Sequence, residues 1–435
     1  MMEQPEKVYD LIGVGTGPFN LSLAALSEPL EDVEALFFEK QPAFEWHPGM
    51  LIEGTKMQVP FLADLVTMAD PTNPYSFLNY INKQGRMYPF YFLQRLDIPR
   101  REYNDYCQWA AEQLSSCVFG KEVVGLTLQE EKSLYAVEVQ DVRTQETRTY
   151  YAENLVLGTG SVPVMPASFR EVEGDGVFHT SEFLNHYDRC RNAESITVVG
   201  SGQSAAETFR ELLKEQRNGG YRLDWITRSP GFESMEESKL SLEHFSPDYV
   251  DYFYQLPQKQ KDDIFAGQGL YYKGISNHTI NDIYNLLYEH TVGQETLNVG
   301  LKVLSEINRI HRNEAGHYTL EGRHIQKDET FSHDSEVVIA ATGYQPYVPD
   351  FVKELTELLE WDDDGRYKVT EDYRLVQKNP GANHIYVHSG ISHTHGVGST
   401  NLGLSVHRNK VIINHLTKRD VYPLNETNVF QTFDV

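Results

Sequence analysis

Two glycine-rich turns, each directly after a short apolar run, constrain the fold of this chain more than any other feature. The first reads IGVGTGPFNL over residues 12–21, and the second reads VGSGQSAA over residues 199–206. A turn of this kind joins a buried parallel strand to a helix, whose N-terminal end attracts a pyrophosphate. The sequence therefore predicts an α/β fold with two Rossmann-like dinucleotide-binding domains and a smaller mixed, mainly helical substrate region.

The first turn has the spacing of a dinucleotide site. Gly13 permits the tight turn, and Gly15 lets the backbone approach a pyrophosphate. Pro18 stands where a third glycine is usual, and its fixed φ suits the first turn of a helix. Glu39 ends the next predicted strand, 35–39, where an acid can accept hydrogen bonds from ribose hydroxyls. A purely structural glycine turn is the alternative, which the spaced acid disfavours.

The second turn matches G-x-G-x-x-A through Gly200, Gly202 and Ala205. The strand after its helix ends in Arg228 rather than an acid, and an arginine there can pair with a 2′-phosphate, which favours NADPH. Arg228 as a plain surface charge is the alternative. A degenerate hydrolase nucleophile elbow around Ser204 would need glycine at Ala206, and it would leave the first turn unexplained.

The order of these motifs predicts how the chain is divided. We expect the first part of an FAD-binding domain over 1–190 and an inserted NADPH-binding domain over 191–335, with a helical substrate segment over about 231–300. The second part of the FAD domain and a C-terminal substrate-site segment follow over 336–435. The glycines of 158–160 and 341–343 end predicted strands and fit the crossings between these domains.

Two dinucleotide sites in one chain indicate a flavoenzyme that needs an electron acceptor. Cys107, Cys117 and Cys190 lie far apart without a C-x-x-C pair, so a disulfide is a poor acceptor and a reducing cytoplasm is expected. Oxygen is the remaining choice. NADPH would reduce FAD, O2 would add at the flavin C4a, and the hydroperoxide would pass oxygen to a nucleophile, so the cofactor supplies the chemistry.

Charge and hydropathy exclude several classes of partner. The net charge of −25 argues against nucleic acid and anionic membranes, which select for Lys and Arg patches. No run approaches 18 apolar residues, and the N-terminus lacks a basic segment followed by an apolar one, so neither a membrane span nor a signal peptide is expected. The acidic charge fits solubility or a salty cytoplasm, and long-range attraction of a cationic substrate is the weaker alternative.

Several motifs, in order from about residue 8 to about residue 415, resemble the microbial N-hydroxylating flavin monooxygenases. They are the first turn, WHPGM (46–50), MQ (57–58), NPYSFLNY (73–80), GQSA (202–205), ATGY (341–344) and THG (394–396). This family includes the L-lysine N6- and L-ornithine N5-monooxygenases of hydroxamate siderophore biosynthesis. The resemblance implies homo-oligomers, homotetramers among them.

The resemblance also assigns residues to the cofactors. It implies that FAD is lined by Gly13, Gly15, Gly17, Pro18, Asn20, Glu39, Trp46, His47 and Gln58, and NADPH by Gly200, Gly202, Gln203, Ser204 and Arg228. It places the His395-Gly396 turn near the flavin and the substrate. Gln58 is also a candidate catalytic residue. Lys273 and Asn277 are two more, because they could replace an asparagine that the family carries near the nicotinamide.

Two departures from the family's pattern concern the substrate. Ala63 stands where the amino-acid enzymes have a lysine that pairs with the substrate carboxylate, and Leu242 stands before Glu243 where the family has Asn or Asp. A buried carboxylate without a partner would cost several kcal/mol. We therefore expect a short aliphatic diamine: 1,3-diaminopropane, putrescine or cadaverine. The candidate partners for its second ammonium are Asp64, Glu236, Glu237 and Glu243.

Alternative interpretations stay open. Lys56 or Lys239 could hold a carboxylate, in which case the chain is an L-lysine N6- or L-ornithine N5-monooxygenase; an NADPH–flavin oxidoreductase or a non-catalytic regulator are more distant. His393 and His395 form an H-x-H without a third ligand, so no metal is expected. His179 with Phe183 lacks the tryptophan of the Baeyer–Villiger H-x-x-x-W motif.

Overall fold

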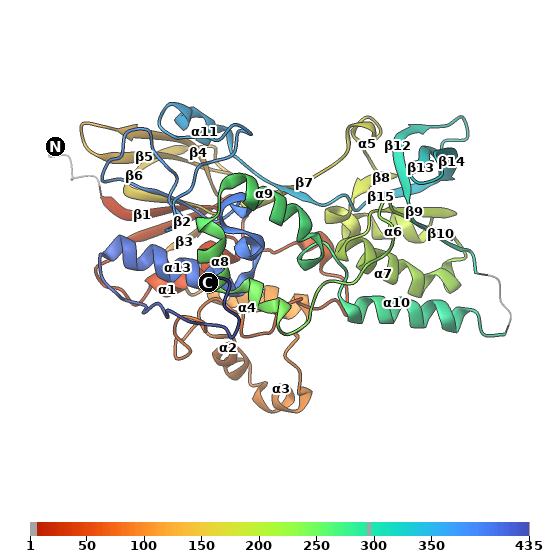
Figure 1. Ribbon diagram of the computed structural model, residues 1–435, viewed down its shortest axis with the longest axis horizontal. Helices are drawn as coiled ribbons and strands as arrows, with labels where there is room; N and C mark the ends of the chain where they lie inside the picture. Colours follow the sequence, from red (N-terminus) through yellow and green to blue (C-terminus); the bar gives the residue numbers. More distant parts are fainter. Residues whose placement is uncertain (1–6, 294–296, 435) are drawn as a thin grey trace.

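Two sheets, set side by side, organise the chain in the computed structural model, which describes residues 7–293 and 297–434 (Figure 1). The first sheet follows the order β3-β2-β1-β6-β5-β4, with β17 paired to β6. Its strands are β1 (Val8–Val14), β2 (Ala35–Glu39), β3 (Cys117–Phe119), β4 (Lys121–Gln129), β5 (Leu134–Asp141), β6 (Thr147–Leu157) and β17 (Ile385–Val387).

The central strand β1 is apolar and fully buried from Leu11 to Ile12, as expected for a strand covered on both faces. It pairs in parallel with β2 and β6, which confirms the predicted parallel α/β core. Helices α1 (Pro18–Ser27), α4 (Arg100–Ala111) and α13 (Leu402–Thr417) contribute to one shared apolar cluster with residues of β1, β2 and β6.

The second sheet follows the order β11-β10-β9-β15-β8, all parallel. Its strands are β8 (Val177–His179), β9 (Ser195–Val199), β10 (Arg222–Ile226), β11 (Val299–Lys302) and β15 (Val337–Ala340). Helices α7 (Gln203–Gly219) and α10 (Asn277–His290) pack against it. Because β8 and β15 belong to this sheet, it extends past both limits, 191 and 335, that the sequence predicted for the inserted domain.

A thin antiparallel ribbon joins the two sheets. Strand β7 (Ser161–Pro163) follows Gly158-Thr159-Gly160, and β16 (Tyr344–Pro346) follows Thr342-Gly343. They pair in the register Tyr344 to Pro163, and Figure 1 shows β7 running between the two halves. The two glycine segments therefore lie at the domain crossings, as the sequence predicted.

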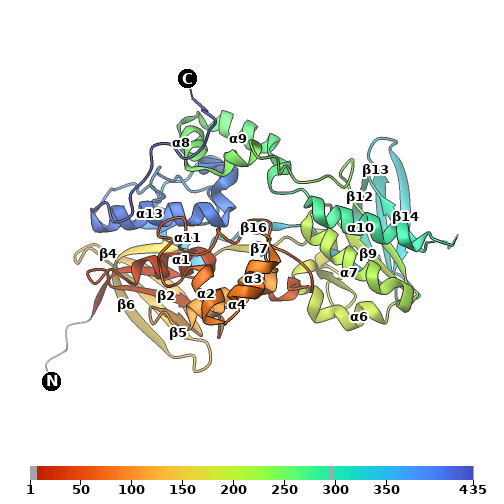
Figure 2. The ribbon, with the colours of Figure 1, turned by 90° about the horizontal axis from the view of Figure 1, so that it is seen from below.

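Most remaining helices cover the first sheet or the space beside it. Residues 40–100 hold α2 (Phe77–Lys83) and α3 (Met87–Leu93), and the substrate segment is mainly helical, as predicted. Figure 2 shows α8 and α9 beyond α13, with the C-terminus above α8. Serines and an asparagine cap four helices: Ser76 caps α2, Ser246 caps α8, Ser276 caps α10 and Asn401 caps α13.

The shorter elements are α5 (Ala167–Arg170), α6 (Tyr187–Arg191), α8 (Pro247–Gln255), α9 (Gln258–Gly267), α11 (Asp350–Lys353), α12 (Ser392–His395), and the 3-10 helices η1 (Pro48–Met50), η2 (Thr180–His186), η3 (Ser241–Phe245), η4 (Gly269–Tyr271), η5 (Glu354–Glu357) and η6 (Val397–Thr400).

The sequence analysis predicted the end of β6, the strand before Gly158, but none of the antiparallel pairing. Strands β4, β5 and β6 form one meander, and β12 (Ser305–Arg312), β13 (Tyr318–His324) and β14 (Glu329–Ser335) form a separate sheet. The three cysteines are free thiols, with Cys107 and Cys190 buried. In the part of the chain that the structure describes, no helix is long and apolar enough to cross a bilayer.

Candidate active site

The first glycine turn is built for close backbone approach. Gly15 has φ +81°, and a Cβ there would lie 2.7 Å from the carbonyl oxygen of Gly158, at the end of β6. Gly15 is therefore required for the three strand ends to meet. A Cβ at Gly17 would meet no atom within 4 Å, so the space before the N-terminus of α1 is open. An anion such as a pyrophosphate fits this opening.

Polar groups around the turn are partly used and partly free. The backbone N–H of Thr16 donates to Glu39 Oε2 at 2.9 Å, and Asn20 Nδ2 donates to the Gly15 carbonyl at 2.6 Å. Thr16 Oγ1 and Asn20 Oδ1 are buried without a hydrogen-bond partner. Because a carboxylate accepts about four hydrogen bonds, Glu39 retains capacity for ribose hydroxyls. These groups fit the ADP half of FAD.

Trp46 and His47 form one wall near the domain crossing. The Trp46 ring packs edge-on against Tyr103 at 5.2 Å, and the His47 ring packs edge-on against Tyr344 at 5.7 Å. His47 adopts the left-handed region, with φ +51°. Although His47 keeps an exposed surface, desolvation by the protein around its ring, together with the Arg100 charge, lowers the pKa of His47 to about 4. His47 is therefore neutral at physiological pH.

The second glycine turn has the same construction. Gly200 has φ +143°, and a Cβ there would collide with the carbonyl oxygen of Ala341. The N-terminus of α7 at Gly202 carries no side-chain cap, so its N–H groups are available to a phosphate. Arg228 is exposed just past the end of β10. This arrangement fits NADPH, with Arg228 positioned after the second strand as the sequence predicted.

The amide of Gln203, a predicted NADPH contact, is hydrogen-bonded within the protein. Nε2 donates to Glu207 at 2.9 Å and to Thr279 Oγ1 at 3.0 Å, while Oε1 accepts from the Ser276 N–H at 2.8 Å. Gln203 thus fixes the start of α10 against α7. Glu207 in turn forms a buried bidentate ion pair with Arg100 from the other half of the chain.

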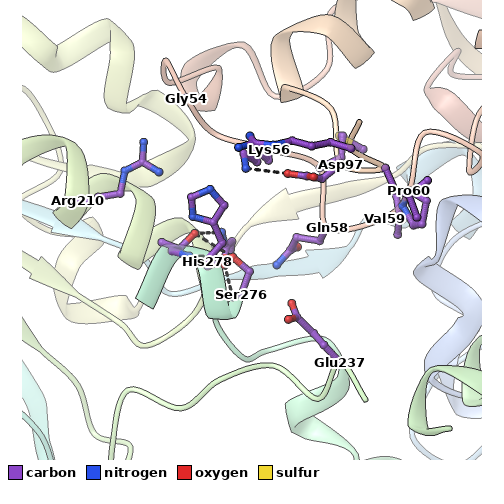
Figure 3. Close-up of a pocket in the computed structure, with 15 residues that line it drawn as sticks. Gly54, Lys56, Gln58, Val59, Pro60, Asp97, Arg210, Glu237, Ser276 and His278 are labelled. Carbon is purple, nitrogen blue, oxygen red and sulfur yellow. Dashed lines mark hydrogen bonds and ion pairs between the residues drawn. The ribbon is translucent and has the colours of Figure 1, made fainter. Parts of the chain in front are cut away.

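A cavity of about 510 Å³ lies between the two halves. Its walls come from residues 54–60 and 95–97 on one side, and from α7, α10 and Glu237 on the other. Figure 3 shows Gln58 near its centre, the Lys56–Asp97 pair at one wall and Glu237 opposite. The cavity is therefore lined by residues of both dinucleotide-binding domains, and the predicted catalytic residue Gln58 is one of them.

Charge is unevenly distributed over this cavity. Its lining includes the cations Lys56, Arg95 and Arg210, although the chain has a net charge of −25. Lys56 pairs with Asp97 at 2.8 Å, and despite burial this hydrogen bond holds the pKa of Asp97 below its usual range. The cationic wall suits phosphate groups, and the carboxylate of Glu237 stands apart from it.

Ala63 is 6% exposed and lies against the start of α13, since a Cβ on Gly403 would be 3.6 Å from the Ala63 Cβ. Asp64, a predicted partner for the ammonium, is used inside the fold. It accepts hydrogen bonds from the N–H groups of Val66, Thr67 and Phe77 and from the Thr67 hydroxyl. This arrangement contradicts the substrate role considered for Asp64.

Leu242 and Glu243 lie in η3, beside the C-terminal tail. Leu242 is 41% exposed. The Glu243 carboxylate accepts from the backbone N–H groups of Gln431, at 2.9 Å, and Phe430, at 3.3 Å. Glu243 also does not line the cavity between the two halves, and together with these contacts to the tail this contradicts an ammonium-binding role for it. Sequence reasoning missed this tail, which has no motif.

Lys273 and Asn277, the two other predicted catalytic residues, do not line the cavity themselves. The Lys273 side chain is exposed, and its ammonium lies over the Tyr272 ring at 5.1 Å, away from the cavity lining. The structure therefore does not support Lys273 as a catalytic residue. Asn277 is also exposed, but its Nδ2 donates to Glu237 Oε2 at 3.2 Å, which connects it to the cavity.

The histidines singled out in the sequence serve the protein frame. His395 is buried, bonded to Thr394 Oγ1 at 2.8 Å and stacked on Tyr373, and burial lowers its pKa to about 3. His179 bonds to the Gly343 carbonyl at 3.1 Å at the domain crossing. Gly396 has φ +73° and forms a backbone turn. Because the His395 ring is buried, this backbone turn is the candidate contact for a flavin. Within the described residues no group of three His, Cys, Asp or Glu could hold a metal.

Two glycine turns at the ends of parallel strands in two sheets, with one cavity between the domains, define a two-domain flavoprotein oxidoreductase that uses a nicotinamide dinucleotide. The chain belongs to the L-lysine 6-monooxygenase/L-ornithine 5-monooxygenase family, whose model matches residues 7–346. It is accordingly an FAD- and NADPH-dependent N-monooxygenase that consumes O2.

Relatives and solved structures cover the whole chain. The putrescine N-hydroxylase of Shewanella oneidensis is 39% identical over 427 residues, 98% of this chain and 84% of that protein. The FAD-bound structure of DfoA, the desferrioxamine-pathway cadaverine monooxygenase of Erwinia amylovora, superposes with a TM-score of 0.95 at 39% identity and covers 99% of both chains. The Kutzneria ornithine N-hydroxylase KtzI, with reduced FAD, NADP+ and L-ornithine, has a TM-score of 0.87 at 30% identity, covering 95% of this chain and 99% of that one.

Proposed function

We propose that the enzyme hydroxylates one terminal amine of a short aliphatic diamine, 1,3-diaminopropane, putrescine or cadaverine, in hydroxamate siderophore biosynthesis. The observation that carries this proposal is Ala63. It is buried at the position where the resemblance expects a lysine that binds an amino-acid carboxylate. An alanine supplies no charge-assisted hydrogen bond, and an unpaired buried carboxylate is strongly unfavourable.

The lysines that could have replaced that function offer little support for an amino acid. Lys56 is engaged with Asp97 at 2.8 Å. Lys239 is exposed and does not line the cavity. The names of the putrescine and cadaverine enzymes at 39% identity agree with a diamine, whereas the ornithine enzyme is more distant at 30%.

Glu237 is our candidate for the partner of the distal ammonium. Among the acids considered from the sequence, Asp64 and Glu243 are occupied, and Glu237 alone lines the cavity. The amide of Asn277 donates to one of its oxygens and so orients the carboxylate. A carboxylate with a remaining acceptor oxygen at a cavity wall can bind an alkylammonium through a charge-assisted hydrogen bond.

The protein's part in the reaction is to bind, orient and exclude water. FAD reduced by NADPH supplies the reactive oxygen that is derived from O2. Gly13, Gly15 and Gly17 with α1 would hold FAD, and Gly200, Gly202 and Arg228 with α7 would hold NADPH. Gln58 would contact the reacting end of the amine, which must be neutral to act as a nucleophile. Ala63 is buried, and an amine bound beside it would be held in that neutral form, because desolvation disfavours an ammonium.

The experiment is product analysis with the purified holoenzyme. We expect NADPH oxidation and hydroxylamine formation with at least one of the three diamines, and none with L-lysine or L-ornithine. Hydroxylation of lysine or ornithine with all diamines inert would refute the diamine proposal. NADPH oxidation that yields only peroxide with every amine would instead support the NADPH–flavin oxidoreductase alternative.

A single variant probes the alanine directly. Ala63→Lys should raise turnover of L-lysine or L-ornithine and reduce turnover of the diamine. The reason is that it places a lysine ammonium, the expected partner of an amino-acid carboxylate, at this buried position. Leu62→Lys is the matched control, since Leu62 is 38% exposed next to it. A cytoplasmic location and a homotetramer or other homo-oligomer remain predictions from the sequence and the resemblance.

A further inference from the structure

The C-terminal tail reaches back to the substrate segment. After Tyr422, whose hydroxyl donates to the Leu26 carbonyl at 2.8 Å, the chain crosses from α1 and α13 to η3 and α8. Figure 2 shows this terminal stretch passing above α13 and ending beside α8. The hydrogen bonds and ring contacts recorded for 425–433, apart from those within the stretch, all run to residues 240–252.

Two carboxylates of the substrate segment receive the tail's backbone. Asp248 accepts from the Asn428 N–H at 3.1 Å and from its Nδ2 at 2.9 Å. Glu243 accepts from the N–H groups of Phe430 and Gln431. The Gln431 side chain returns a hydrogen bond to the Leu240 carbonyl at 2.5 Å. Hydrogen bonds to charged groups are stronger than neutral ones, so these acids fix the tail's position.

An aromatic contact completes the attachment. The Phe433 ring lies 5.0 Å from Tyr249, 5.3 Å from His244 and 6.2 Å from Tyr252. Phe430, three residues earlier, is 96% exposed and makes no such contact. The two phenylalanines therefore differ in packing while sharing the same tail.

Residues 240–253 also contact the turn that carries Gly396 and leads to α13. A Cβ on Gly396 would lie 3.1 Å from Phe253 in α8, and a Cβ on Gly398 would lie 3.7 Å from the His244 carbonyl. Gly396 and Gly398 lead into α13, whose Gly403 meets Ala63. Residues 240–253 are thus held between the tail and the turn that carries Gly396.

We propose that residues 425–434, the C-terminal clamp, position the substrate segment and thereby set the enzyme's affinity for its amine. This inference rests on the proposed function, because it assumes that the amine binds beside Ala63 and the segment that continues from Glu237. The clamp acts through the segment, so its residues are positioning residues. Since the hydrogen bonds and ring contacts described for 425–433 reach neither glycine turn, we expect the clamp to leave NADPH binding unchanged.

The test compares two single variants of the full-length holoenzyme, Phe433→Ala and Phe430→Ala, with putrescine and cadaverine as probes. Phe433→Ala should raise the amine KM about fivefold or more, the effect of about 1 kcal/mol of lost coupling. Its kcat, NADPH KM and FAD content should stay unchanged. Phe430→Ala should match the wild type. An unchanged amine KM in Phe433→Ala, or an equal change in kcat and NADPH KM, would overturn the clamp.

Coupling is reciprocal, which gives a second readout. Putrescine should slow backbone hydrogen exchange in both 425–434 and 240–252 of the wild type, and this protection of 425–434 should be lost in Phe433→Ala. If putrescine leaves backbone hydrogen exchange in 425–434 of the wild type unchanged, the proposal is also overturned. If the wild type accepts only lysine or ornithine, the proposed function fails, and the same comparisons are made with that amino acid.

Discussion

Arg100 and Glu207 join the two halves of the enzyme through a bidentate ion pair, with N–O distances of 2.8 and 2.7 Å. Arg100 begins α4 beside the first sheet, and Glu207 lies on α7 beside the second. Their side chains are 12% and 1% exposed, so the pair is desolvated. Through Glu207 the pair also holds Gln203, which fixes the start of α10 at the cavity.

Breaking this pair should destabilise the enzyme. Arg100→Met leaves the Glu207 carboxylate buried without its cation, and we expect a loss of about 3–5 kcal/mol in the free energy of unfolding. Chemical denaturation of the holoenzyme measures it. The control is Arg323→Met, which breaks the exposed Arg323–Asp328 pair and should cost less than about 1 kcal/mol. Equal losses in both variants would contradict the role of burial.

Arg228 should determine the choice of nicotinamide cofactor. Arg228→Gln removes the proposed partner of the 2′-phosphate, so the preference for NADPH over NADH should fall about 10- to 100-fold, as expected for a charge-assisted hydrogen bond worth about 1.5–3 kcal/mol. Flavin reduction by each cofactor in a stopped-flow instrument measures the ratio. Lys214→Gln, on the same domain beside Glu211, should leave it unchanged. An unchanged NADPH-to-NADH preference in Arg228→Gln would show that Arg228 is a surface charge that does not bind the 2′-phosphate.

Glu237 should contribute to amine binding. Glu237→Gln keeps the shape but loses the charge, and the KM for putrescine should rise about 10- to 100-fold for the same energetic reason. Glu236→Gln is the neighbouring control, because the Glu236 carboxylate accepts from Ser238 and does not line the cavity. If Glu236→Gln has the larger effect, the assignment of the two acids is reversed.

His395 should make the fold sensitive to acid. Burial lowers its pKa to about 3, whereas the unfolded chain binds the proton near pH 6.5. The unfolded state therefore gains stability as the pH falls from 6.5 toward 3, and native stability is lost over that window. By linkage, this one group removes about 2 kcal/mol between pH 7 and pH 5. The drop between those pH values should be smaller by that amount in His395→Gln, and identical pH dependence in both proteins would contradict the burial of a neutral ring.

The dinucleotide core could be predicted from the sequence because local chemistry determines it. Gly15 and Gly200 have backbone angles and close contacts that other residues cannot adopt, and the apolar strands before them are short and buried. The strands β4, β5 and β12–β14 were missed because these half-exposed antiparallel strands lack the continuous apolar run of a parallel strand, whereas the buried end of β6 was predicted.

The site could be predicted only in part, because its geometry depends on distant contacts. Arg100 and Glu207 are separated by 107 positions and have no motif that joins them. The assignments of Glu243 and Lys273 rested on the positions where this chain departs from the family's pattern. The structure directs Glu243 to the tail and Lys273 to the Tyr272 ring. Conversely, Gln58 and Glu237 line one cavity although they are separated by 179 positions.

The most direct test of the account is incorporation of isotopically labelled O2 by the holoenzyme with NADPH and an equimolar mixture of putrescine, cadaverine, 1,3-diaminopropane, L-lysine and L-ornithine. Mass spectrometry of the products identifies which amine gains labelled oxygen. We predict one labelled oxygen on the nitrogen of a diamine and none on either amino acid. Label found on lysine or ornithine, with the diamines unlabelled, would contradict the account.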